Sequence, residues 1–140
     1  MQPFQTVAGL LLAASLGVAA LPALAATPAE ILSGFDDSSR ADSARFGGFS
    51  AVRGEQFFKS THGNDWSCAS CHTPSPLAPG KHAKTGKQIA PLAPAANPQR
   101  FTDAAKVEKW FKRNCSDVVG RACSAQEKGD VLAYLLSLAK

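Results

Sequence analysis

The chain has 140 residues, with 15 Lys or Arg, 11 Asp or Glu and a formal net charge of +4 at pH 7. This length provides one domain with a modest hydrophobic core rather than several large domains. The basic excess is small enough to be explained by solubility alone, although it also favours encounter with an acidic protein.

The first 25 residues are typical of a secretory signal peptide. An apolar stretch from Val7 to Leu24 ends in Ala23-Leu24-Ala25, which is an Ala-x-Ala cleavage pattern. No Lys or Arg precedes the stretch, so a retained membrane anchor is the alternative. We expect residues 1–25 to be removed and residues 26–140 to form a single exported domain. Nucleic acid is not an expected partner in that compartment.

A first short helix is predicted to begin after Thr27. Thr27 and Glu30 can form a capping box, with Pro28 at the first helical position. A short apolar face follows, made of Ile31, Leu32 and Phe35. Residues 36–48 are polar and contain glycine, so they are predicted to be a connector.

A second helix is predicted from Ala51 to Lys59, with Ser50 as its N-cap. Its buried face is expected to hold Gly54, Phe57 and Phe58. A glycine on this face permits a close crossing against a helix near the C-terminus.

The segment Cys68-Ala69-Ser70-Cys71-His72 is the attachment pattern for a c-type haem. Two thiols three residues apart can form thioethers with the two vinyl groups of one porphyrin, and the next imidazole can ligate the iron. The alternatives are half of a zinc site or a dithiol redox pair. No second Cys-x-x-Cys completes a zinc tetrahedron, and no strand-rich pattern surrounds the motif. The sequence predicts one covalent haem c, attached at Cys68 and Cys71, with His72 as the proximal iron ligand.

Residues 73–100 contain six prolines and few periodic apolar residues. Loops this long are uncommon unless they are functional, so we expect this one to wrap the haem edge. The carbonyl of Pro76 or Pro79 is a candidate acceptor for the Nδ1–H of His72, and the residues alone do not distinguish the two.

A third helix is predicted after Thr102 as cap. One side of it carries Ala104, Val107, Trp110, Phe111 and Asn114. The opposite side carries Lys106, Lys109, Lys112 and Arg113. The amide of Asn114 thus projects from an apolar face, where it needs a hydrogen-bond or metal partner.

The last helix is predicted to open with a capping box between Ser124 and Glu127. Its amphipathic stripe is formed by Val131, Tyr134, Leu135 and Leu138, and suits packing on the helix that holds Gly54. The predicted fold is therefore small and all-α, with about four helices around one covalent haem.

The second axial position of the iron has no methionine candidate after signal cleavage, because Met1 is the only Met in the chain. The remaining candidates are His62, His82, Asn114, a lysine or an open position. From the residues alone these stay open.

The C-terminal part of the chain, about residues 50–140, resembles the sphaeroides haem protein family. This family contains monohaem class I-like cytochromes c, including the ligand-switching cytochrome c''. The matching segments are Thr85 to Pro94, Arg100-Phe101-Thr102-Asp103, Val107-Glu108-Lys109-Trp110, Arg113-Asn114-Cys115 and Gly120-Arg121-Ala122-Cys123.

The resemblance implies that Asn114, immediately before the first C-terminal cysteine, is the distal haem ligand. An amide oxygen is a hard, weak ligand that suits ferric iron better than ferrous iron. The resemblance therefore implies release of Asn114 on reduction, binding of O₂, CO or NO, and electrons received from a dihaem cytochrome c in the periplasm.

Cys115 and Cys123 are left over from the haem motif. In an exported protein two such thiols are expected to join, and the family carries a disulfide at these positions. A structural crosslink is a simpler role for this bridge than redox regulation.

Three functions follow from these residues. The first is a ligand-binding cytochrome that also exchanges electrons, with a docking surface at Lys81, Lys84 and Lys87 together with Lys106, Lys109 and Lys112. The second is a low-spin electron carrier that keeps both axial ligands. The third is an enzyme, such as an oxidase or a nitric-oxide-consuming haem protein. No distal acid–base pair is visible, although Arg113 or Lys112 could polarise bound oxygen.

Overall fold

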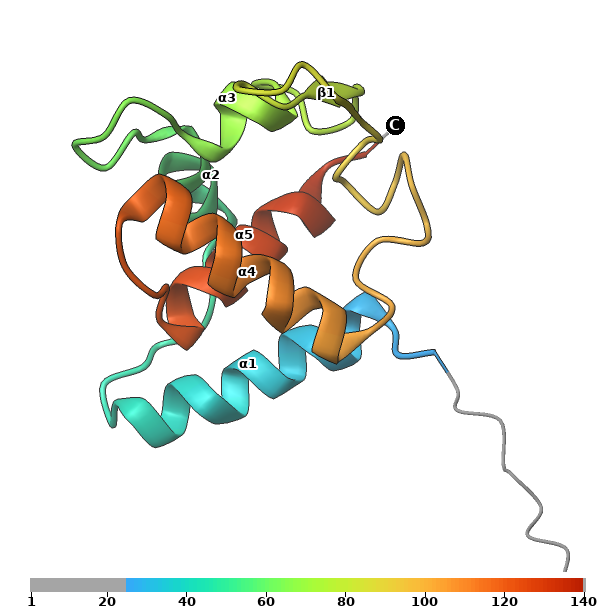
Figure 1. Ribbon diagram of the computed structural model, residues 1–140. Helices are drawn as coiled ribbons and strands as arrows, with labels where there is room; N and C mark the ends of the chain where they lie inside the picture. The colour runs from blue at the N-terminus through green and yellow to red at the C-terminus, as the bar shows by residue number, and fades with distance from the viewer. Residues whose placement is uncertain (1–24, 140) are drawn as a thin grey trace, which may run out of the picture.

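The computed structural model describes residues 25–139, so the predicted signal peptide lies outside the described residues apart from Ala25. The regular secondary structure of the described chain is nearly all helical, as predicted (Figure 1). Its elements are α1 (Pro28–Asp42), α2 (Ala51–Lys59), α3 (Cys68–His72), β1 (Gly80–Lys81), β2 (Gln88–Ile89), α4 (Ala104–Val119) and α5 (Ala125–Ser137). The helix not expected in advance is α3, which is the Cys-x-x-Cys-His motif itself. None of the helices between residues 25 and 139 has the length and apolar character needed to span a membrane.

Helix α1 begins as predicted but is longer than predicted. Thr27 Oγ1 accepts a hydrogen bond from the Glu30 backbone N–H (3.2 Å), and Glu30 Oε2 accepts one from the Thr27 backbone N–H (2.6 Å). The helix then continues to Asp42, so the prediction that a connector starts at residue 36 was wrong. Residues spaced by four, Ile31, Phe35 and Ser39, are buried and hold the extra turns against the core.

Helices α2 and α5 cross at Gly54, as predicted. A Cβ atom at Gly54 would lie 1.9 Å from the backbone oxygen of Asp130, so only glycine allows this approach. The Asp130 carboxylate is 7% exposed, and it accepts hydrogen bonds from the Ser50 backbone N–H (2.7 Å) and from Arg53 Nε (2.8 Å). The crossing is therefore closed by a steric fit and by an ion pair whose carboxylate is buried and whose Arg53 side chain is half exposed.

The core lies on both sides of α5, which Figure 1 shows in the middle of the molecule. One cluster joins α1, α4 and α5 through Ile31, Phe35, Val107 and Leu132. The other joins α2 and α5 through Phe58, Val131, Tyr134 and Leu135. The predicted stripe on the last helix is thus buried, except that Leu138 is only partly covered and ends the helix.

Helix α4 begins one residue later than predicted. Its N-cap is Asp103, whose Oδ1 accepts the Lys106 backbone N–H at 2.9 Å. The Thr102 hydroxyl instead donates to the Gln99 carbonyl at 3.0 Å. Both residue types are good caps, so the choice depended on the preceding turn.

The proline-rich segment between α3 and α4 is mostly irregular, as predicted, but it contains a small antiparallel ribbon. In this ribbon Gly80 pairs with Ile89, and Lys81 pairs with Gln88. A Cβ at Gly80 would lie 2.0 Å from the Cys71 carbonyl oxygen, so glycine lets the ribbon lie directly against α3.

Candidate haem site

The haem-attachment motif faces a cavity of about 1670 Å³. Helices α3, α4 and α5 and the segment from the ribbon to residue 105 supply its walls. Cys68, Cys71 and His72 line it from α3, and Asn114 lines it from α4. The fold thereby brings together residues that are more than 40 positions apart in the sequence.

Local hydrogen bonds shape α3. Ser67 Oγ accepts the Ser70 backbone N–H (3.2 Å), and Ser70 Oγ accepts the Ser67 backbone N–H (2.9 Å). The single helical turn puts the free thiols of Cys68 and Cys71 on neighbouring positions, and the Cys71 sulfur accepts the Ala83 backbone N–H at 3.3 Å. This arrangement suits two attachment points on one planar group.

Electrostatics favour the protonation state that an iron ligand needs at His72. Burial, assisted by the positive charge of Arg100, lowers the pKa of His72 to about 4, so the imidazole is neutral at pH 7. Only a neutral imidazole has a free lone pair for a metal. Burial also raises the pKa of Cys68 to about 11, which keeps this thiol protonated in the haem-free protein.

The cavity lining fits a large flat apolar group. Five of its apolar side chains are Phe101, Trp110, Phe111, Val131 and Leu135. Trp110 is 46% exposed, which is high for an indole, and lies on the rim. A porphyrin attached at α3 would meet this apolar lining, so the residues present fit a covalent haem. In the described part of the chain, no group of three or more His, Cys, Asp or Glu residues is arranged so that it could hold a metal ion.

The candidates for the distal ligand separate in space. His62 lies outside the cavity, with Nε2 at 2.9 Å from the Phe57 carbonyl oxygen and its ring packed on Phe57. His82 lines the cavity, but its Nδ1 accepts backbone N–H groups from Lys84 (3.2 Å) and Thr85 (3.3 Å). The neutral imidazole of His82 therefore carries its proton on Nε2. Ligation through Nε2 would move this proton to Nδ1, and both hydrogen bonds would be lost.

Asn114 lines the same cavity as His72, and its side chain makes no hydrogen bond to another residue between 25 and 139. Arg113 also lines the cavity, although the helical spacing had assigned it to the opposite side. The guanidinium lies 5.8 Å from the centre of the Trp110 ring.

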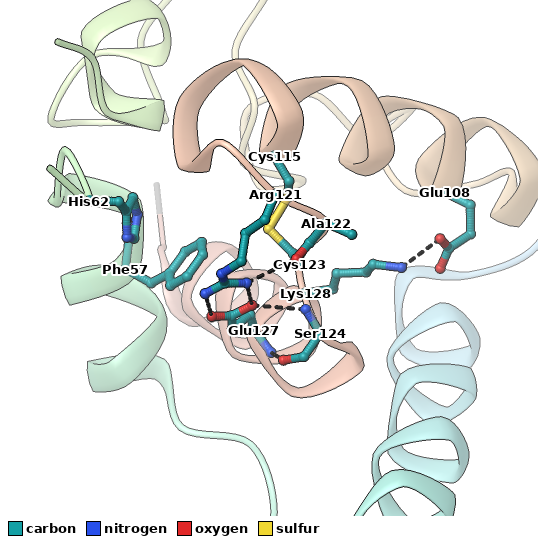
Figure 2. The surroundings of a disulfide bond; sticks show 10 residues. All are labelled: Phe57, His62, Glu108, Cys115, Arg121, Ala122, Cys123, Ser124, Glu127 and Lys128. Carbon is teal, nitrogen blue, oxygen red and sulfur yellow. Dashed lines mark hydrogen bonds and ion pairs between the residues drawn. A yellow bond between two sulfur atoms is a disulfide. The ribbon is translucent and has the colours of Figure 1, made fainter. Parts of the chain in front are cut away.

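Three contacts fix the C-terminal part of α4 and the link to α5, and Figure 2 shows two of them, the Cys115–Cys123 disulfide and the Arg121–Glu127 ion pair. Cys115 and Cys123 form a disulfide with a Cα–Cα distance of 5.7 Å, as predicted. Arg121 pairs with Glu127 of α5 at 2.6 Å and lowers the pKa of this carboxyl. Asn64 Nδ2 donates to the Val118 carbonyl at 2.9 Å.

Sequence reasoning assigned no role to Arg100, although it lines the cavity. It lies in the cavity wall close enough to His72 to affect its pKa. The signal that could have singled it out is isolation, because Arg100 is the only charged residue between Lys87 and Asp103.

Comparisons with known proteins agree with this site. A family model described as a domain of unknown function, DUF1924, matches residues 44–135. Cytochrome c-type protein SHP from Cereibacter sphaeroides is 44% identical over 124 residues, which cover 84% of this chain and 91% of that protein. Cytochrome c'' from Methylophilus methylotrophus is 49% identical over 83 residues, covering 59% of this chain and 58% of that protein.

Solved structures of the same two proteins also resemble this chain. The structure of oxidized SHP, described as an oxygen-binding cytochrome c, matches with a TM-score of 0.72 and 41% identity, covering 81% of this chain and 99% of that one. Oxidized cytochrome c'' from M. methylotrophus matches with a TM-score of 0.72 and 38% identity, over 81% of this chain and 95% of that one. The chain therefore belongs to the family of SHP and cytochrome c'' that DUF1924 describes, and it is a monohaem c-type cytochrome with covalently bound haem c.

Proposed function

We propose that this protein binds small diatomic ligands at its haem iron, in a position that Asn114 vacates on reduction, and that it receives electrons from a partner protein in the periplasm. The observation that carries the proposal is that Asn114 and His72 line one cavity from different helices. The haem supplies the redox couple and the coordination position for the diatomic ligand.

Four residues are proposed to hold the haem, two by covalent bonds and two as iron ligands. Cys68 and Cys71 form the two thioethers, and the neutral imidazole of His72 is the proximal iron ligand. Asn114 contributes its amide oxygen as the distal ligand, from a helix end fixed by the neighbouring disulfide. Export of residues 26–140 after removal of residues 1–25 accounts for both the haem attachment and the disulfide.

Release of Asn114 follows from the chemistry of its side chain. An amide oxygen is a hard donor that binds ferric iron weakly and ferrous iron more weakly still. Since no hydrogen bond from residues 25–139 holds the Asn114 amide, it can leave without breaking a hydrogen bond to those residues. The related SHP is described as an oxygen-binding cytochrome c, which supports O₂, CO or NO as the ligand here.

The electron donor is expected to be an acidic protein, with a dihaem cytochrome c as the candidate. Residues 66–102 contain Lys81, Lys84, Lys87 and Arg100 and no Asp or Glu. The three lysines are exposed, and none takes part in an ion pair among the described residues. Lys84 and Lys87 line the cavity, so a negative protein surface docking here would lie beside the haem.

Optical spectra of the haem-loaded protein test the proposal. We expect the ferric form to be low-spin, the ferrous form to be high-spin, and CO to bind the ferrous form readily. Asn114→Ala should convert the ferric spectrum to a high-spin form and leave ferrous CO binding intact, because it removes a ligand used only in the oxidised state.

His82→Ala is the matched control, since it removes the one histidine besides His72 that lines the cavity among residues 25–139. Its spectra should match those of the unmodified protein. If His82→Ala changes the ferric spectrum and Asn114→Ala does not, the ligand assignment is wrong. If the ferrous form of the unmodified protein is low-spin and ignores CO, a simple electron carrier becomes the better account.

A further inference from the structure

Arg100 places a half-buried positive charge in the cavity wall, where it has no carboxylate partner among residues 25–139. In residues 25–139 the ion-paired arginines are Arg40, Arg53 and Arg121, each bound to an acid. Arg100 instead donates from Nε to the Pro91 carbonyl (3.0 Å) and from Nη2 to the Ala90 carbonyl (2.8 Å). These two bonds use two of its five N–H groups, so three donors remain.

The guanidinium is held in place by backbone rather than by charge. Pro91 also accepts Asn97 Nδ2 at 3.3 Å, and the Arg100 backbone N–H donates to the Asn97 carbonyl at 3.0 Å. This fixes the direction of the side chain before any anion binds. A preorganised guanidinium of this kind loses little entropy when it binds a planar carboxylate.

The charged groups around the cavity do not neutralise Arg100. Asp103 is engaged as the N-cap of α4, and Asp117 lies three residues beyond Asn114 on the same helix. The other charged lining residues are the cations Lys84, Lys87, Lys106 and Arg113, with His72 neutral and His82 on the ribbon turn. Burial of an unpaired cation is costly, and burial lowers the pKa of Arg100. The cavity wall thus supplies no free carboxylate for Arg100.

We propose that Arg100 binds a propionate carboxylate of the haem and thereby helps to set the reduction potential of the iron. The proposal rests on the haem occupying this cavity, and its geometric basis is an unpaired, backbone-oriented guanidinium in the wall beside His72. Without the guanidinium, the carboxylate would leave an uncompensated negative charge near the iron. That charge favours the ferric state, which is the more positive of the two.

The reduction potential of Arg100→Gln tests the proposal. Glutamine keeps an amide donor for the Pro91 carbonyl but removes the positive charge. The variant therefore changes the electrostatics of the cavity while keeping the loop around residues 90–100 largely ordered. We expect the potential to shift to a more negative value, and most of the shift to persist at high salt, because salt screens a half-buried pair in direct contact less than it screens exposed, separated charges. Arg100→Lys keeps the charge, so its reduction potential should lie close to that of the unmodified protein.

Lys106→Gln is the matched control, because it removes the same charge from an exposed residue that also lines the cavity. At low salt, the shift in potential for Lys106→Gln should be at most about one third of the shift for Arg100→Gln, and at high salt it should vanish. Equal shifts for Arg100→Gln and Lys106→Gln would overturn the proposal.

A second measurement uses the unmodified protein and does not depend on a variant folding. In the diamagnetic ferrous form, with CO added where it binds, proton NMR should show nuclear Overhauser contacts between the Arg100 guanidinium and a propionate methylene. Absence of these contacts, with Arg100 resonances assigned, would also overturn the proposal. Failure of CO to bind would count against the proposed release of Asn114 and leave this test intact.

Discussion

Gly54 lies where α2 crosses α5, whereas Gly34 lies on the exposed side of α1. Both are helical, but a Cβ at Gly54 would meet the backbone of Asp130 at 1.9 Å, and a Cβ at Gly34 would meet nothing within 4 Å. Gly54→Ala must push two helices apart and should lower the free energy of unfolding by about 3 kcal/mol. Gly34→Ala should raise it by about 1 kcal/mol, because alanine is the better helix former.

Chemical denaturation of the two haem-loaded variants measures both effects. Because both variants replace a helical glycine with alanine, they share the same gain in helix propensity. An opposite sign of the change in unfolding free energy is then due to the helix crossing at Gly54. A Gly54→Ala protein with the midpoint of the unmodified protein would show that the crossing tolerates a methyl group.

At the scale of elements, the end of α4 is joined to the start of α5 by the Cys115–Cys123 disulfide and by the Arg121–Glu127 ion pair. The disulfide closes a loop with a sequence separation of 8. Replacing both cysteines with alanine should lower the free energy of unfolding by roughly 2 to 3 kcal/mol, chiefly by freeing the unfolded chain. We expect the ferric spectrum to be unchanged, because the contacts of Asn64 and Arg121 still hold the helix end.

Thermal or chemical unfolding gives the stability change, and the ferric optical spectrum tests whether the proposed ligation by Asn114 is retained. Loss of the low-spin ferric spectrum in the folded double variant would mean that the disulfide controls ligation directly, in addition to crosslinking the chain. The single variant Arg121→Gln serves as a comparison, since it removes the ion pair and leaves the disulfide.

At the scale of the whole molecule, the net charge is unevenly distributed along the chain. Residues 66–102 hold four bases and no acids, whereas the rest of the chain holds 11 bases and 11 acids. The entire formal charge of +4 therefore belongs to the segment that carries the haem motif and the ribbon. Such a local field raises the rate of encounter with anions more than the net charge alone would.

Small redox reagents can measure this field without knowledge of the partner. Hexacyanoferrate, an anion, should exchange electrons faster at low salt than at high salt, and hexaammineruthenium, a cation, should do the reverse. Replacing Lys81, Lys84 and Lys87 together with glutamine should slow the anion reaction about tenfold at low salt.

The sequence had placed Lys109 and Lys112 in the docking surface, but neither lines the cavity, so we confine the proposed surface to the ribbon segment. Together with Arg45 they provide a control set, because all three are exposed and have no ion pair among residues 25–139. Their joint replacement with glutamine removes the same total charge and should slow the anion reaction less than threefold, because that charge lies farther from the haem. Equal slowing in the two sets would show that only net charge matters and that the ribbon is not the docking surface.

Local chemistry accounts for the features that were predicted correctly. Helix starts at Thr27, Ser50 and Ser124 depend on side chains within three residues of the cap, and all three are confirmed. The features that were wrong depend on distant partners. The polar residues after Phe35 stay helical because Ser39 packs on the core, and α4 starts at Asp103 because Thr102 is used in the preceding turn.

The sequence by itself determined the cofactor, the family and the identity of each candidate ligand, because the haem motif and the segments around Asn114 are contiguous patterns. Only the tertiary structure decided which candidates meet in one cavity. It separated His62 from the site, engaged His82 Nδ1 with backbone and brought Asn114 and Arg100 to the walls around His72. The physical reason is that ligand geometry depends on the crossing of α2 and α5 and on the anchoring of α4, both of which join residues far apart along the chain.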